Sequence, residues 1–247
     1  MKSLRVASHV HSSWSYDGEW ELEHLARAFR RLGYDAVLMA EHCRTFDQER
    51  WEQYRAACSA ASGAGMLLVP GIEYEDGDNC VHTVVWGPSV PFLGSGRPTL
   101  EILRAARDHD AATLMAHPRR RDAMSRFRDD WAPLLSGVEI WNRKYDGVAP
   151  NCDAQALADD NDLVPFVGLD FHNARQFFPL AMSIPAGSAP SASTLVHAIR
   201  SGSCRPELLG VFASRFTRGA EGATVRALEE VRGAMRRPAR RLRERVR

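Results

Sequence analysis

Short apolar runs alternate with amphipathic segments along most of this chain, and this alternation constrains the fold more than any other feature. The apolar runs have the length of strands, whereas residues 21–32 place Leu22, Leu25 and Phe29 at helical spacing before Gly33. Strands that alternate with helices are typical of parallel sheets joined by right-handed crossovers. The pattern predicts an α/β fold, either a closed barrel or an open, doubly wound sheet.

The expected elements follow this alternation as far as residue 169. Strands are expected at residues 4–7, 36–40, 66–69, 81–86, 113–116, 138–141 and 164–169. Helices are expected at residues 21–32, 49–61, 99–107 and 152–159. The number of strands favours the barrel over the open sheet.

Histidine and carboxylate side chains gather at the ends of these expected strands. The set comprises His9, His11, Asp17, His42, Glu73, His82, His117, Asp170 and His172. In a (β/α) barrel the carboxyl ends of the strands converge on one face, where active sites are built. In an open sheet the same side chains would be spread along a row. Their placement therefore also favours a barrel.

Imidazole and carboxylate together are the ligands that suit zinc, iron or manganese. A single histidine near a strand end is more often a hydrogen-bonded structural residue than a ligand, but this set needs a common cause. In the segments His9-Val-His11 and Asp170-Phe-His172, a spacing of two puts both side chains on the same face of an extended chain. The other histidines are expected at the surface of helical segments: His24, His109 and His197.

The composition excludes several classes of function. Lys and Arg total 32 against 31 Asp and Glu, so no global field favours nucleic acid or an acidic membrane. The five cysteines are widely spaced and include no Cys-x-x-Cys pair, which indicates reduced thiols. The first residues lack the apolar run of a signal peptide, and no segment reaches the roughly 18 apolar residues of a membrane span. We therefore expect a cytoplasmic protein.

Six short motifs follow one another along the chain. They are His9-x-His11, Ser15-x-Asp17-Gly18, Glu41-His42, Gly71-Ile-Glu73, Ala116-His117-Pro118 and Gly168-x-Asp170-x-His172. Together they resemble the polymerase and histidinol phosphatase (PHP) superfamily over residues 4–205. The resemblance implies a distorted (β/α)7 TIM-like barrel that hydrolyses phosphoesters with up to three divalent metal ions, which would be zinc, manganese or iron.

The resemblance also implies how the ligands are shared among the ions. One ion would be held by His9, His11, Glu73 and Asp170, the residues that would carry the catalysis. A second would be held by Glu73, His82 and His117, and a third by Asp17, His42 and His172. Glu73 would then bridge two ions. In such a trinuclear site a metal-activated hydroxide attacks the phosphorus.

The sequence departs from the family pattern at two motifs. Where the family commonly has Thr-Asp-His, this chain has Ala-Glu41-His42, so the hydrogen bonds around the ligand should shift with the longer acid. Leu169 and Phe171 flank Asp170 where the family often has small residues. His82 lies within an expected strand instead of after one, and is the least supported ligand of the set.

Basic residues on the loops that follow the strands are expected to bind the substrate, a small phosphomonoester or a nucleotide. Arg143 and Lys144 follow the strand at 138–141, and Arg175 follows His172. A guanidinium grips phosphate oxygens with two donors, so Arg143 and Arg175 are the preferred candidates. The three consecutive arginines at 119–121 also follow a strand, but at most two of them can point inward.

Residues 1–205 are expected to form the catalytic barrel, and residues 206–247 a C-terminal extension with a basic, flexible tail. Residues 226–247 contain nine arginines and three glutamates, and Pro238 is expected to break or kink any helix there. An alternative function is therefore a non-catalytic PHP barrel that engages nucleic acid through this tail. Hydrolysis of a C–N bond by a related metallohydrolase barrel is disfavoured, because no strand-end lysine is apparent as a metal bridge.

Overall fold

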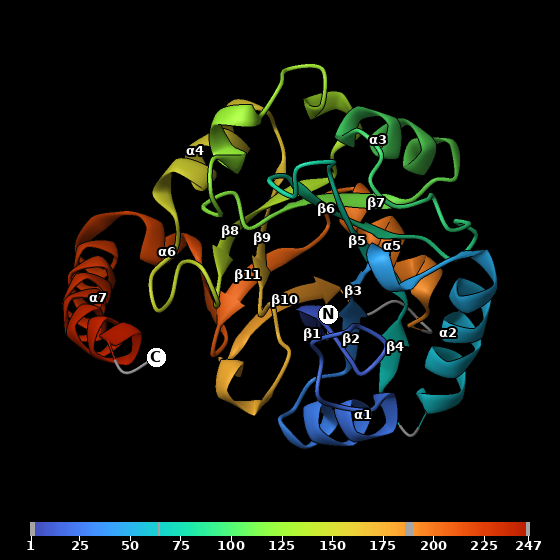
Figure 1. Cartoon of the computed structure of the whole chain (residues 1–247), viewed down its shortest axis with the longest axis horizontal. Coiled ribbons are helices and arrows are strands. Elements are labelled where there is room, and N and C mark those ends of the chain that lie inside the picture. Colours follow the sequence, from blue (N-terminus) through green and yellow to red (C-terminus); the bar gives the residue numbers. More distant parts are fainter. Residues whose placement is uncertain (1–2, 64, 186–189, 246–247) are drawn as a thin grey trace.

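The computed structural model describes residues 3–63, 65–185 and 190–245, and the side chains as far as residue 235. It is a mixed α/β fold in which two six-stranded sheets occupy the middle and the longer helices lie outside them (Figure 1). Apolar side chains from both sheets and from the helices that cover them form one buried core. The α/β fold class predicted from the sequence is confirmed.

The first sheet has the order β12-β11-β10-β1-β2-β4. Its strands are β1 (Ser3–Val10), β2 (Ala36–Met39), β4 (Leu67–Val69), β10 (Leu180–Pro185), β11 (Arg205–Leu208) and β12 (Val211–Phe212). The second sheet has the order β3-β5-β6-β7-β8-β9. Its strands are β3 (Glu41–His42), β5 (Gly71–Glu75), β6 (His82–Trp86), β7 (Ala112–Ala116), β8 (Gly137–Asn142) and β9 (Val164–Gly168).

The α-helices are α1 (Leu22–Arg31), α2 (Gln48–Ala61), α3 (Thr99–Asp108), α4 (Cys152–Asp160), α5 (Ala192–Arg200), α6 (Ser214–Thr217) and α7 (Gly219–Arg245). Single 3-10 turns occupy Cys43–Thr45, Ala123–Arg126, Ala132–Leu134 and Ala174–Gln176. Side-chain caps start several helices: Asp47 accepts a hydrogen bond from Arg50 N at the start of α2, and Asn151 caps α4. The sequence pattern predicts α1 to α4 but not α5.

The alternation with helices predicted parallel strands throughout, but some of the strands are antiparallel. β6 is antiparallel to both β5 and β7, and β10 is antiparallel to β1. The physical reason is the connection between β5 and β6, which is too short to hold a crossover helix and therefore reverses the chain. This reversal places His82, the first residue of β6, at the same sheet edge as Glu75 and Ala116, its partners on β5 and β7.

The two sheets are linked along the backbone. β2 continues into β3 across Ala40, and β4 continues into β5 across Pro70. On the opposite side, the segment after β9 hydrogen-bonds to β1: Leu169 N donates to Ser8 O at 3.0 Å, and Phe171 N donates to His9 O at 3.1 Å. The second sheet is therefore joined to the first through β3 and β5 and through the segment after β9.

The C-terminal residues differ from the expected tail. β11 and β12 extend the first sheet, so the expected boundary after residue 205 falls within a strand. The structure then continues as α7, a helix that includes Pro238 instead of breaking there. Figure 1 shows α7 at the edge of the molecule, beside α6. The side chains of the basic residues from 236 onward lie outside the described residues.

Three smaller expectations also have an outcome. All five cysteines are free thiols. The three histidines assigned to the surface, His24, His109 and His197, are exposed. Over the part of the chain that the structure describes, no helix is both long and apolar enough to cross a membrane.

Candidate metal centre

The nine ligands predicted from the sequence form one connected cluster of side chains. They come from β1, β3, β5 and β6 and from the loops that follow β1, β7 and β9. All of them are buried except His42, which is partly exposed, and Asp17, which is exposed. Side chains that are far apart in the sequence therefore meet in one place.

Glu73, in the middle of β5, lies at the centre of this cluster. Its Oε1 is close to three imidazoles: His82 Nδ1 at 2.7 Å, His117 Nε2 at 2.8 Å and His9 Nε2 at 3.4 Å. Its Oε2 is close to two more: His42 Nδ1 at 3.0 Å and His11 Nε2 at 3.7 Å. One carboxylate is thus shared by five imidazoles.

Asp170 and Asp17 complete the cluster from two sides. Asp170 Oδ1 lies 3.7 Å from His11 Nε2 and 3.4 Å from His172 Nδ1. Asp17 lies between His42 and His172, with Oδ1 3.3 Å from His42 Nε2 and Oδ2 3.2 Å from His172 Nε2. Because the Asp17 side chain is 37% exposed and that of Asp170 only 3%, Asp17 marks the solvent edge of the cluster.

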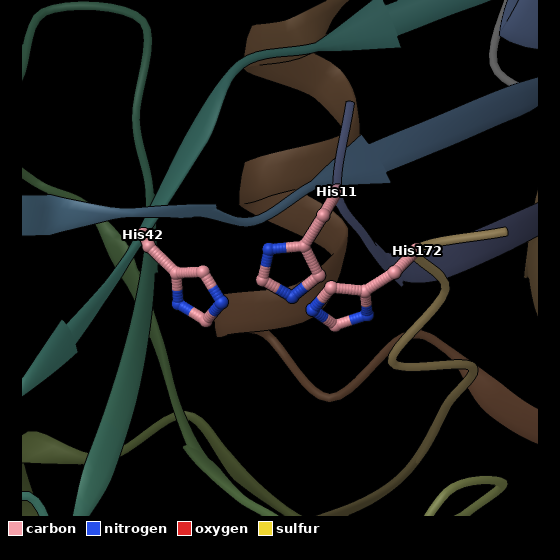
Figure 2. Close-up of side chains that lie close together, drawn as sticks. All are labelled: His11, His42 and His172. Carbon is pink, nitrogen blue, oxygen red and sulfur yellow. The ribbon is translucent and has the colours of Figure 1, made fainter. Parts of the chain in front are cut away.

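Three groups of side chains could each hold an ion, because within each group the potential ligand atoms lie within 4.8 Å of one another. The groups are His9, His11 and Asp170; His9, Glu73 and His117; and His11, His42 and His172. The first group is part of the first predicted set. The other two share two members each with the second and third predicted sets. Figure 2 shows His11 between His42 and His172, and its ring centroid lies 4.4 Å and 4.2 Å from theirs.

The cluster fits metal ions because several of its buried atoms have no hydrogen-bond partner among the described residues. These atoms are His11 Nε2, His117 Nδ1 and Asp170 Oδ2, while His9 Nε2 and His172 Nε2 have only the carboxylate contacts at 3.4 Å and 3.2 Å. Burying a polar atom without a hydrogen bond is costly, and native proteins rarely do so. Imidazole nitrogens and a carboxylate oxygen that converge in this way form a donor set suited to zinc, iron or manganese.

His82 differs from the other imidazoles. Its Nδ1 contacts Glu73 Oε1, and its Nε2 lies 2.6 Å from Asn79 Oδ1, so both ring nitrogens have partners. It is absent from the three groups of converging ligand atoms. His82 therefore links the central carboxylate to Asn79.

The electrostatics of the cluster centre on the shared carboxylate. Burial favours the neutral form of Glu73, but the neighbouring imidazoles, His82 and His9 first, hold the pKa of Glu73 well below its usual range. Burial also opposes the charged form of His42, yet Asp17 and Glu73 raise its pKa to about 10. Burial, and then repulsion from His42, lowers the pKa of His11. A divalent cation bound in this cluster would compete with protons for the imidazole nitrogens.

Three of the clustered residues have left-handed backbone conformations. The φ angles are 58° at His9, 26° at His117 and 47° at Asp170. Such conformations are uncommon for residues with a side chain and persist where the surroundings enforce them. At His9 the pairing of β1 with β2 also shifts register between Ser8 and Val10. The bulge turns His9 and the next strand-end histidine, His11, toward the same carboxylate.

Sequence reasoning missed Glu139, a fully buried acid in β8. Its Oε1 lies 2.7 Å from His9 Nδ1, and its Oε2 accepts hydrogen bonds from His117 N at 2.7 Å and Asn142 Nδ2 at 2.8 Å. A Cβ on Gly168 of the neighbouring strand would collide with this carboxylate. The available signal was the acid itself, which interrupts an otherwise apolar strand.

Glu41, the acid that replaces the family's commoner Asp, is also fully buried. It accepts hydrogen bonds from Ser12 Oγ and Ser15 Oγ, each at 2.5 Å, and from Ser12 N at 3.0 Å. Ser15 Oγ in turn accepts a hydrogen bond from His42 N at 3.0 Å. The longer acid therefore supports the loop after β1 and the backbone of His42.

The basic residues lie on the segments that follow β7, β8 and β9. The Arg143 guanidinium lies 5.0 Å from the ring centroid of Phe178, and Arg175 is exposed on the loop after His172. Arg120 donates to Tyr145 Oη and to Asn79 Oδ1, the partner of His82. Lys144 reaches the cluster itself, with Nζ 3.2 Å from Asp170 Oδ1.

The sequence matches no protein-family model and no curated protein. Among solved structures, it resembles a two-domain protein from Bacteroides vulgatus that contains a predicted PHP-like metal-dependent phosphoesterase. The TM-score is 0.66 at 17% identity, over 84% of this chain and 65% of that protein. The two chains share a fold over this region. PsfC from Pseudomonas syringae is also similar, with a TM-score of 0.63 at 15% identity, over 94% of this chain and 98% of PsfC. At 17% and 15% identity, these similarities show a shared fold.

Proposed function

We propose that this chain is a PHP-superfamily phosphoesterase that hydrolyses a small phosphomonoester or a nucleotide with divalent metal ions. The observation that carries the proposal is the convergence of buried ligand atoms without hydrogen bonds around Glu73. The PHP-like fold supports the same superfamily and reaction class. The free cysteines support a cytoplasmic location for this activity.

We infer that the two sheets close into a distorted barrel. β2 with β3 and β4 with β5 each act as one bent strand, and β6 to β9 follow in order. The hydrogen bonds from Leu169 and Phe171 to β1 close the ring at seven strand positions. The catalytic domain would then include β11 and β12, and α6 with α7 would form the C-terminal extension.

We assign up to three ions to the cluster. His9, His11, Glu73 and Asp170 would hold the first, and Glu73 with His117 the second, with His82 as its third ligand or as the residue that orients Glu73. His42, His172 and Asp17 would hold the third, and the exposure of Asp17 makes this position the most accessible from solvent. Zinc, manganese and iron all suit these donors.

The chain's own residues would position the reacting groups. Bound divalent cations supply Lewis-acid stabilisation of phosphoryl oxygens and lower the pKa of water. The contact with Glu139 occupies His9 Nδ1, which leaves Nε2 to face Glu73. The apolar side chains of Leu169 and Phe171 are buried on either side of Asp170 and keep water away from those flanks of the carboxylate. Because the ligands are already placed by the strands, little reorganisation is needed when phosphorus is attacked.

The decisive experiment combines metal analysis with a phosphoester panel. Purified, metal-loaded protein should contain more than one equivalent of transition metal and release phosphate from at least one monoester. His117→Ala should lose metal and turnover, whereas His197→Ala, which replaces an exposed histidine of α5, should keep both. A folded protein that binds metal but turns over no phosphoester would overturn the proposal, as would a parent that binds no metal.

A further inference from the structure

Lysine is rare in this chain. The sequence has two lysines, Lys2 and Lys144, against 30 arginines. Lys144 lies in the turn after β8, and its Nζ is 3.2 Å from Asp170 Oδ1. The Lys144 side chain is 36% exposed and that of Asp170 only 3%. The ammonium group is therefore reachable from solvent and at the same time contacts the buried carboxylate of a candidate metal ligand.

The turn that carries Lys144 is held by hydrogen bonds to the interior. Asn142 Oδ1 accepts from Lys144 N at 3.0 Å and from Tyr145 N at 3.2 Å. Asn142 N donates to the buried Asp146 Oδ2 at 2.7 Å, and Asn142 Nδ2 donates to Glu139 Oε2 at 2.8 Å. Because Glu139 also contacts His9, the same network fixes Lys144 and a candidate ligand.

Aromatic packing fixes the other side of the turn. The Tyr145 ring centroid lies 4.7 Å from that of His117, and Lys144 Nζ lies 5.7 Å from the Tyr145 ring centroid. Arg120 Nε donates to Tyr145 Oη at 3.1 Å. Lys144 is thus placed between the ring beside His117 and the carboxylate of Asp170.

The two oxygens of Asp170 have different surroundings. Oδ1 faces Lys144, whereas Oδ2 is buried without a hydrogen bond among the described residues and is free to bind an ion. An ammonium group has three donors, so Lys144 can keep its contact with Oδ1 and still donate to an anion that arrives from solvent. Lysine binds phosphate as a point charge, which favours a dianion over a monoanion.

We propose that Lys144, held by the turn on Asn142, forms the substrate-phosphate subsite and selects phosphomonoester dianions over phosphodiesters. This inference rests on the proposed phosphoesterase function and names its substrate class. It places phosphate recognition on Lys144, beside the ligand Asp170, instead of on Arg143 or Arg175.

The rarity of lysine allows a direct binding test. Biosynthetic incorporation of 13Cε-lysine labels only Lys2 and Lys144 and leaves the three donors of each ammonium group intact. Lys144→Arg identifies the Lys144 signal by its loss. In metal-loaded protein, inorganic phosphate should shift this signal with saturation, and dimethyl phosphate should shift it far less. A Lys144 signal that does not respond to phosphate, or responds equally to both anions, overturns the proposal.

Kinetics supply the second test. Lys144→Met should reduce kcat/KM for a monoester and weaken inhibition by phosphate about 10- to 100-fold, since a charge-assisted hydrogen bond is lost. Metal content should be unchanged, and Lys144→Arg should restore part of the loss. Arg27→Met, which replaces an exposed arginine of α1, is the control and should leave both quantities unchanged.

The failures of the two proposals can be told apart. If the parent protein is active and Lys144→Met matches it, the subsite is wrong and the phosphoesterase function stands. If Lys144→Met loses metal, Lys144 supports Asp170 and does not form the subsite. If the parent hydrolyses no phosphoester, the proposed function fails, while the labelled Lys144 signal still reports whether phosphate binds.

Discussion

Glu139 Oε1 lies 2.7 Å from His9 Nδ1, so a buried acid that is not itself a candidate ligand supports one of the candidate ligands. The same carboxylate holds the backbone N–H of His117. One buried side chain therefore positions two histidines that approach Glu73 from different strands. Groups in this position commonly matter for metal affinity nearly as much as the ligands do.

Glu139→Gln should weaken metal binding about 10- to 100-fold. All three of the groups that contact Glu139 can act as donors, so the amide NH2 of glutamine must face at least one of them. Metal titration of the purified variant measures the effect. Glu207→Gln, in the partly buried strand β11, is the control and should bind metal as the parent does. Unchanged affinity in Glu139→Gln would refute the role given to this acid.

Gly168→Ala should destabilise the protein by about 1–3 kcal/mol, the usual cost of overpacking a buried site. The new Cβ would collide with the Glu139 carboxylate, which its three contacts hold in place. Chemical denaturation of the metal-free protein measures the change. Gly77→Ala should be nearly neutral, because no atom lies within 4 Å of its added Cβ. Equal stabilities for the two variants would mean that Glu139 can move.

Asp146→Asn should stabilise the protein at alkaline pH more than at acidic pH. Burial raises the pKa of Asp146 to about 7, so the folded protein holds this proton more tightly than the unfolded chain does. The stability that protonation contributes is complete below the unfolded pKa and is lost as the pH rises to about 7. At one pKa unit per 1.36 kcal/mol, the advantage of asparagine could reach about 4 kcal/mol above that pH.

Unfolding curves at pH about 5 and about 8.5 would measure this difference, since the two values lie on either side of the raised pKa. Asp129→Asn, at an exposed position, serves as the control and should show no such dependence on pH. A gain from Asp146→Asn that is the same at both pH values would contradict the assignment.

Ending the chain after Met235 should leave turnover of a small substrate unchanged. α7 is attached to the rest of the protein before that point: Glu229 Oε2 accepts a hydrogen bond from Val148 N at 2.9 Å, and Arg226 donates to Thr217 O at 3.1 Å. Ending the chain after Arg218 removes these contacts and should lower the melting temperature. The non-catalytic alternative would be favoured by a different result: a parent protein that binds nucleic acid but hydrolyses nothing, and a chain ending after Met235 that no longer binds it.

The candidate ligands can be found in the sequence because most of them lie at or near the end of an expected strand. Histidine and carboxylate are uncommon in buried positions, so residues such as His9 and Asp170 stand out in apolar surroundings. His82 fits less easily into a parallel pattern, because nothing in its own strand shows that β6 runs in the reverse direction. The short connection before it was the available signal.

The residues that support the ligands are much harder to predict. Glu139 lies within a strand, and its role depends on contacts with His9 and His117, which are distant in sequence. Arg143 and Lys144 are adjacent, so sequence alone cannot decide which of them reaches Asp170. The turn on Asn142 decides it. Likewise, Pro238 lies inside α7, although proline usually ends a helix.

The left-handed residues His9, His117 and Asp170 have a consequence for evolution. Each adopts a conformation that glycine would adopt more cheaply. Alanine at any of these positions would remove the side chain and keep the backbone strain, whereas glycine would remove both. A related chain that no longer needed these three side chains would therefore gain stability by drifting to glycine at these places.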